Sequence, residues 1–133
     1  MRRWSPSERA EVRSPELDDY FDGRPESREI FDILAERISA LGEAEMTISS
    51  QISFGRRRKF AWFWLYNVTK RNPDGVPHLM LALDQERKSE HVRDVSQVGK
   101  RRWNHQIVVR SAADARSRWL GELLVLAYRY GDG

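Results

Sequence analysis

The sequence predicts an α+β fold, in which a mainly antiparallel sheet of about five strands packs against two N-terminal helices and one C-terminal helix. Apolar residues recur at helical spacing between positions 15 and 41 and again after position 111. Between positions 46 and 110 they alternate instead, as in β-strands. The links between these strands are short, which favours antiparallel neighbours.

Two helices are expected ahead of the strands. The first begins at Pro15, with Ser14 as its N-cap, and stops before Gly23. The second covers residues 25–41 and is closed by Gly42. Its apolar residues form one stripe that is expected to face the core: Ile30, Phe31, Ile33, Leu34, Ile38 and Leu41.

Five segments alternate as strands do. They cover residues 46–54, 59–68, 79–83, 92–98 and 104–110. Segment 79–83 is apolar on both faces, which predicts a central position in the sheet. The turn-rich residues 70–77 are expected to close a hairpin. In the last strand, His105, Ile107 and Val109 are expected to point inward.

One long helix is expected after the last strand. Ser111 and Asp114 have the spacing of a capping box, with Asp in place of the usual Glu or Gln. The helix should continue to about Tyr130. Its broad apolar face consists of Trp119, Leu120, Leu123, Leu124, Leu126 and Ala127.

The length of 133 residues is enough for one domain with its own core. Residues 1–14 show no apolar period, so we expect a flexible N-terminal arm followed by a single domain over residues 15–133. The absence of cysteine excludes disulfides, thiolate catalysis and cysteine-bound zinc. The N-terminus does not resemble a signal peptide, and no apolar run approaches the roughly 20 residues of a membrane span. We therefore expect a cytoplasmic protein without membrane contact.

The net charge of +3 conceals two segments of opposite sign. Residues 15–45 carry a net charge of −7, whereas residues 46–133 carry +8. Such polarity can steer anionic ligands to one face of a protein. Alternatively, the acidic segment simply lies near the basic one and offsets its charge.

The most informative segment joins four cations, residues 56–59, to five aromatic residues among the next seven. In an extended strand, alternate side chains share a face, so one face is expected to carry Arg56, Arg58, Phe60, Trp62, Trp64 and Tyr66. Aromatic rings beside arginine suit bases and nucleotides. We therefore predict a ligand site formed by Arg56, Arg58, Trp62, Trp64, Trp103 and His105. The alternative is that these tryptophans fill the core.

No familiar catalytic motif occurs, and the three histidines are isolated from one another, so neither a metal nor an organic cofactor is expected. His105 is the candidate catalytic residue, because a histidine beside Trp103 and several cations suits acid–base chemistry near neutral pH. The alternative is a buried histidine bonded to the backbone.

Four stretches carry a family resemblance: Tyr20-Phe-Asp-Gly-Arg-Pro-Glu26, Gln51-Ile-Ser-Phe54, Arg57-Arg-Lys-Phe-Ala-Trp62 and Trp103-Asn-His105. Over about residues 17–130, the chain resembles a small bacterial domain of unknown function, family 5655, sometimes labelled a predicted transport protein. The resemblance implies an α+β domain that occurs alone or beside nuclease-like and other partners, and it implies no established activity. Asn104 stands where members of that family often have a second histidine.

These observations predict a non-enzymatic binding module whose basic, tryptophan-lined site takes an anionic ligand. The ligand is either a nucleotide-like small molecule or single-stranded nucleic acid. Two alternatives are a small enzyme that uses His105 on an anionic substrate, and a scaffold domain for protein contacts.

Overall fold

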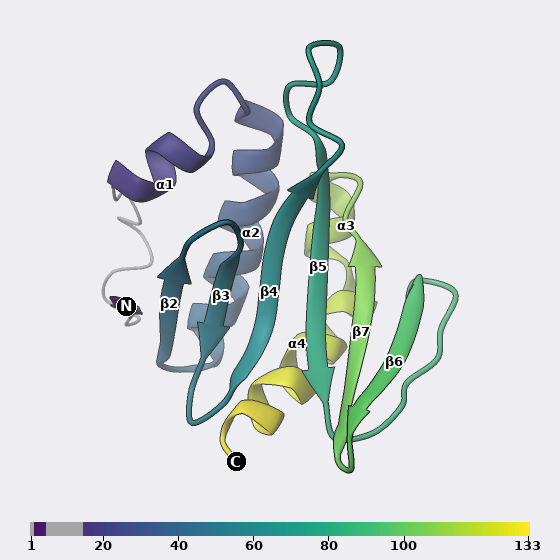
Figure 1. Cartoon of the computed structure of the whole chain (residues 1–133). Helices are drawn as coiled ribbons and strands as arrows, with labels where there is room; N and C mark the ends of the chain where they lie inside the picture. The colour runs from purple at the N-terminus through teal and green to yellow at the C-terminus, as the bar shows by residue number, and fades with distance from the viewer. Residues whose placement is uncertain (1, 5–14) are drawn as a thin grey trace.

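The alternating segments form one antiparallel sheet, and the helices of the described residues lie on one face of it (Figure 1). The computed structural model describes residues 2–4 and 15–133. Its strands follow the order β1-β2-β3-β4-β5-β7-β6 across the sheet, which confirms the predicted α+β class. The strands are β1 Arg2–Trp4, β2 Ala44–Ile48, β3 Ile52–Gly55, β4 Lys59–Tyr66, β5 Val76–Leu83, β6 Asp94–Gly99 and β7 Arg102–Val108. The helices are α1 Pro15–Tyr20, α2 Pro25–Leu41, α3 Ala112–Arg116 and α4 Arg118–Gly131.

The sheet has seven strands rather than about five. The segment predicted as one strand over residues 46–54 is a hairpin, β2 and β3, in which Ile48 pairs with Ile52. Because the turn has three residues, 49–51, Ile48 and Ile52 keep the spacing expected within a single strand. The apolar pattern alone could therefore not show that the chain reverses direction between them. Within the expected arm, Arg2–Trp4 pairs with β2 as β1. The rest of that arm lies outside the described residues.

The N-terminus of α2 is capped by a residue from a distant loop. Asp74, between β4 and β5, accepts hydrogen bonds from the Glu26 and Ser27 backbone N–H groups at 3.0 and 3.1 Å. The Ser27 hydroxyl donates to the Asp74 carbonyl at 2.7 Å. A carboxylate at this position satisfies free N–H groups and complements the helix dipole. These contacts attach the β4–β5 loop to α2.

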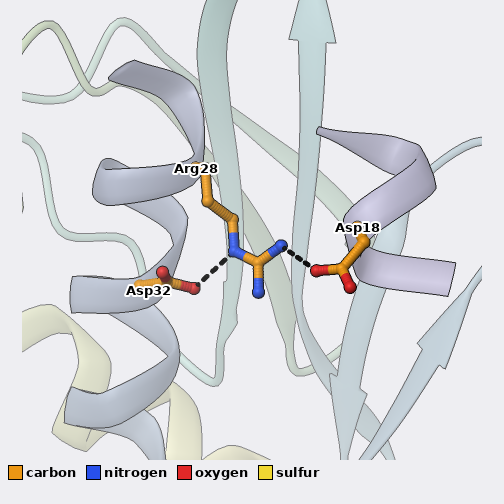
Figure 2. A network of polar contacts seen from close by, with 3 residues as sticks. All are labelled: Asp18, Arg28 and Asp32. Carbon is orange, nitrogen blue, oxygen red and sulfur yellow. Dashed lines mark hydrogen bonds and ion pairs between the residues drawn. The ribbon is translucent and has the colours of Figure 1, made fainter. Parts of the chain in front are cut away.

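An arginine joins the first two helices. Figure 2 shows the Arg28 guanidinium between two carboxylates, Asp18 of α1 at 3.1 Å and Asp32 of α2 at 3.0 Å. The Arg28 side chain is 18% exposed, and its guanidinium lies over the Phe21 ring. The acidic N-terminal segment therefore has an internal cation as a partner.

The predicted final helix is divided into α3 and α4. Ser111 caps α3 as expected, since its hydroxyl accepts from the Asp114 N–H at 3.1 Å. At Ser117 the backbone is extended, and the chain begins a new helix. The Arg37 guanidinium from α2 donates to the Ala115 and Ser117 carbonyls at this break, at 2.7 and 2.9 Å. The break thus depends on a residue far away in the sequence, which explains why local spacing predicted a continuous helix.

The core lies between the sheet and the helices. The Phe31 ring of α2 packs on Phe54 of β3 and Phe63 of β4, with centroids 6.1 and 5.3 Å apart. Helix α4 buries most of its expected apolar face, although Trp119 and Leu126 are only partly buried. β5 lies between β4 and β7 with Leu79, Leu81, Ala82 and Leu83 all within 1% exposure, which confirms its central position.

Candidate functional site

The sheet presents one face to the helices and a second face away from them, which we call the outer sheet face (Figure 1). On β4, Phe63 points to the helices, so its neighbours Trp62 and Trp64 lie on the outer sheet face. The strand register places Met80 beside Trp62, and His78 beside Trp64. It then places Gln106 beside Met80 and Val108 beside His78. Side chains from three strands therefore share this face.

Aromatic rings contact one another where β4 ends and β5 begins. The His78 imidazole stacks on Trp64, with centroids 5.4 Å apart and planes 29° apart. Tyr66 meets His78 edge-on at 5.4 Å. Tyr66 is 62% exposed, and Trp64 is partly exposed, so flat surface is accessible on both. His78 itself is buried, and its Nδ1 lies 3.0 Å from the Val76 carbonyl, which holds the ring in place.

An arginine and two amides extend this face toward β7. The Arg102 guanidinium lies over the Trp62 ring, 5.1 Å from its centroid. Its Nε donates to the Asn104 Oδ1 at 3.2 Å. Asn104 and Gln106 lie on the same side of β7, and both are partly exposed. The outer sheet face thus combines flat rings, one cation and side-chain amides.

Arg56 and Arg58 do not share this face, which corrects the prediction. The Arg56 guanidinium lies 4.0 Å from the centroid of Tyr128, and that of Arg58 lies 4.1 Å from that of Tyr130, both on α4. The alternation fails because the register between β3 and β4 shifts after Phe54, which leaves Phe60 as an extra residue. Phe60 is buried and packs edge-on against Tyr128 on the helix side.

The basic segment instead packs against the C-terminal end of α4. The Arg57 and Arg58 N–H groups donate to the Gly131 carbonyl at 2.9 and 3.0 Å. The Arg56 guanidinium donates to the Tyr128 carbonyl and pairs with Asp132 at 3.2 Å. Cations and N–H donors stabilise a helix C-terminus, where carbonyls lack partners and the dipole is negative. The four consecutive cations are therefore explained in large part by helix docking.

A cavity of about 480 Å³ lies beside this segment. Arg56 and Arg57 contribute to its wall, but so do three carboxylates, those of Glu43, Glu45 and Asp132. The carboxylates outnumber the arginines here, and Arg56 is already paired with Asp132, which disfavours an anionic ligand in this cavity.

Trp103 and His105 also lie on the helix side of the sheet. In the register, Trp103 pairs with Leu83 and His105 pairs with Leu81. Both therefore point to the opposite face from Asn104, which lies between them on β7. His105 is 0% exposed. The Arg87 N–H donates to its Nε2 at 2.9 Å, so Nδ1 carries the proton and donates to the Trp103 carbonyl at 3.0 Å. Both nitrogens of the candidate acid–base residue are thus occupied by backbone groups.

Burial lowers the pKa of His105 below the usual histidine value, because it disfavours the charged ring. The unfolded chain therefore takes up a proton at higher pH than the native protein does. We expect the free energy of unfolding to be highest above about pH 6.5 and to fall as the pH drops below it, by up to about 1.4 kcal/mol per pH unit from this group. Urea denaturation of the wild type and of His105→Gln between pH 5 and 8 measures this effect. Parallel pH profiles for the two proteins would contradict it.

Of the six predicted ligand residues, only Trp62 and Trp64 share the outer sheet face. Sequence reasoning did not assign His78, Arg102, Asn104 or Gln106 to the site. Period-two alternation was visible in both of their strands, but it could not say which residues of β5 and β7 lie beside the tryptophans. That information comes only from the register between strands.

The described part of the chain contains no group of three or more histidine, aspartate or glutamate side chains that could hold a metal ion. None of the helices described is both long and apolar enough to pass through a bilayer.

Comparison with known proteins places this chain in a family. No curated protein and no solved structure matches it. One family model, described as "Domain of unknown function (DUF5655)", matches residues 17–131, which confirms the resemblance inferred from the sequence motifs. The match covers both layers of the fold, from α1 to the end of α4. Because it extends over nearly the whole chain, this protein belongs to the DUF5655 family.

Proposed function

We propose that the protein is a binding module for single-stranded nucleic acid, which lies along the outer sheet face. The observation that carries this proposal is the row of Trp62, Trp64 and Tyr66 on one strand, with His78 stacked beside it. Bases stack on aromatic side chains largely irrespective of sequence, and each stacked base contributes about 1–3 kcal/mol. An exposed antiparallel sheet with such rings is a common way of binding unpaired bases.

Cations at opposite ends of the sheet support a polymeric ligand. Lys70 and Arg71 lie in the loop that follows β4. Lys100 and Arg101 are exposed in the turn between β6 and β7, next to Arg102. Strand direction puts these two groups at opposite ends of the sheet. A single nucleotide would meet one group only, whereas a phosphate backbone could contact both.

The side-chain amides supply polar contacts. Gln106 lies between Met80 and the edge strand β6 in the register, and Asn104 lies two residues before it. Amides both donate and accept hydrogen bonds, so they can meet the exposed edges of unpaired bases. The proposal therefore assigns stacking to β4 and hydrogen bonding to β7.

The enzyme alternative receives less support from the geometry. Its candidate base, His105, is enclosed on the helix side with both nitrogens bonded. A scaffold role remains as the outcome to expect if no nucleic acid binds.

Titration of a fluorescent single-stranded DNA oligonucleotide at several salt concentrations tests the proposal. Tyr66→Ala should weaken binding by about 5- to 100-fold, because one stacking surface is lost. Arg101→Gln should reduce the slope of log affinity against log salt by about 0.7, the effect of one phosphate contact. A mononucleotide should bind weakly with a shallow slope.

Leu41→Ala is the matched control, since Leu41 is a partly exposed apolar residue on α2, in the helix layer. It should bind like the wild type. Equal affinities of Tyr66→Ala and Leu41→Ala, or no oligonucleotide binding at all, would refute the proposal and leave the scaffold alternative.

A further inference from the structure

A second cavity, of about 490 Å³, lies at the end of β7. Its volume is in the range of small-molecule sites. The loop before β6, the end of β7 and the beginnings of α3 and α4 all contribute to it. It is lined by Glu90, His91, Arg93, Val108, Arg110, Asp114 and Trp119.

Stacked rings form one wall of this cavity. The His91 imidazole lies parallel to Trp119, with centroids 4.3 Å apart and planes only 6° apart. Trp119 is partly buried against the core, so the wall is anchored to α4.

Two arginines line this cavity, and their side chains have no partner among the described residues. Within residues 15–133, the side chains of Arg93 and Arg110 take part in no hydrogen bond or ion pair. Of the two carboxylates nearby, Asp114 already accepts from the Arg110 N–H at 3.1 Å. Glu90 is 88% exposed and lies 3.6 Å from His91. The lining therefore carries two guanidinium groups and two carboxylates, and of these charged side chains only the guanidinium groups have no partner among the described residues.

We infer that this cavity binds a phosphate monoester. Two guanidinium forks can share the three terminal oxygens of a phosphate and match its charge of about −1.5 to −2. The volume and the Trp119–His91 wall leave room for a ring attached to the phosphate. The phosphate group belongs either to a free small molecule or to the phosphorylated end of a nucleic acid. The inference does not depend on the function proposed for the outer sheet face.

The test uses phenyl phosphate and measures its affinity by calorimetry and by the rise in melting temperature that binding must produce. Arg110→Gln should weaken binding by about tenfold or more, the usual effect of losing a charged hydrogen bond. This variant keeps the Arg110 backbone N–H that donates to the Asp114 carboxylate, so the fold should be retained. Arg93→Gln should have a similar effect.

Arg118→Gln is the matched control, because it removes one cation from the same helix as Trp119 at a side chain that is 94% exposed. It should bind phenyl phosphate like the wild type. If phenyl phosphate binds the wild type, equal affinities of Arg110→Gln and Arg118→Gln would overturn the inference.

Oligonucleotides with a 5′-phosphate or a 5′-hydroxyl distinguish the two sources. The ligand is a nucleic acid end if the wild type prefers the 5′-phosphorylated oligonucleotide, Arg110→Gln does not, and phenyl phosphate does not bind. Binding of phenyl phosphate by the wild type, with loss in Arg110→Gln, identifies a free phosphate monoester. Absence of both effects would refute the site, even if Tyr66→Ala still weakened oligonucleotide binding on the outer sheet face.

Discussion

Replacing Phe63 with alanine is expected to lower the free energy of unfolding by about 3–5 kcal/mol. Phe63 is 1% exposed, and its ring lies 5.3 Å from that of Phe31 and 5.9 Å from that of Phe21. Truncation would leave a cavity where β4 meets α2 and the end of α1. A loss of this size is a large part of the 5–15 kcal/mol typical of a native domain. Urea denaturation followed by circular dichroism measures it.

Tyr66→Ala, on the same strand, is the control for this prediction. Tyr66 lies on the outer sheet face and is 62% exposed, so its truncation should change stability by only about 0.5 kcal/mol. This variant should therefore bind nucleic acid more weakly while retaining its fold. Comparable destabilisation by Phe63→Ala and Tyr66→Ala would show that the two faces of β4 are wrongly assigned.

The second large effect is expected at the break between α3 and α4. Arg37→Met removes both hydrogen bonds to the Ala115 and Ser117 carbonyls, and hydrogen bonds from a charged donor contribute about 1.5–3 kcal/mol. Gly121 is close by, and a Cβ at this position would overlap the Arg37 Nη2. Gly121→Ala should therefore also destabilise the wild type, since the guanidinium must leave its carbonyl partners.

The two substitutions should not be additive. In the Arg37→Met background, Gly121→Ala should be neutral or stabilising, because alanine is favoured over glycine within a helix by about 1 kcal/mol. A double-mutant cycle from urea denaturation gives the coupling energy, which we expect to reach about 1–3 kcal/mol. Additive losses would mean that Arg37 does not restrict Gly121.

Alternation predicted the orientation of most strand residues correctly. His105, Ile107 and Val109 are all buried as expected, and Leu79 to Leu83 form the middle of the sheet. The same reasoning failed at Phe60. This extra residue in β4 switches the side chains that precede it to the opposite face from the one that alternation predicts. That single irregularity moved Arg56 and Arg58 from the predicted site to the end of α4.

The candidate site could be predicted only in part. Trp62, Trp64 and Tyr66 were recognised as one row because they belong to one strand, where the spacing of two residues is local information. His78, Arg102 and Gln106 join them through pairing between strands. Nothing in the local pattern of β5 or β7 distinguishes these residues from their neighbours on the same strands.

By itself, the sequence determined the α+β class, the positions of the main helices and strands, and the aromatic row, since these follow from local periodicity and turn residues. Only the tertiary structure decided that Asp74 caps α2, that Arg37 holds the break before α4, and that the basic run docks on Gly131. The physical reason is that free N–H and carbonyl groups at helix ends can form hydrogen bonds with any suitably placed partner. Which residue arrives there depends on how distant segments pack, and no spacing within one segment encodes it.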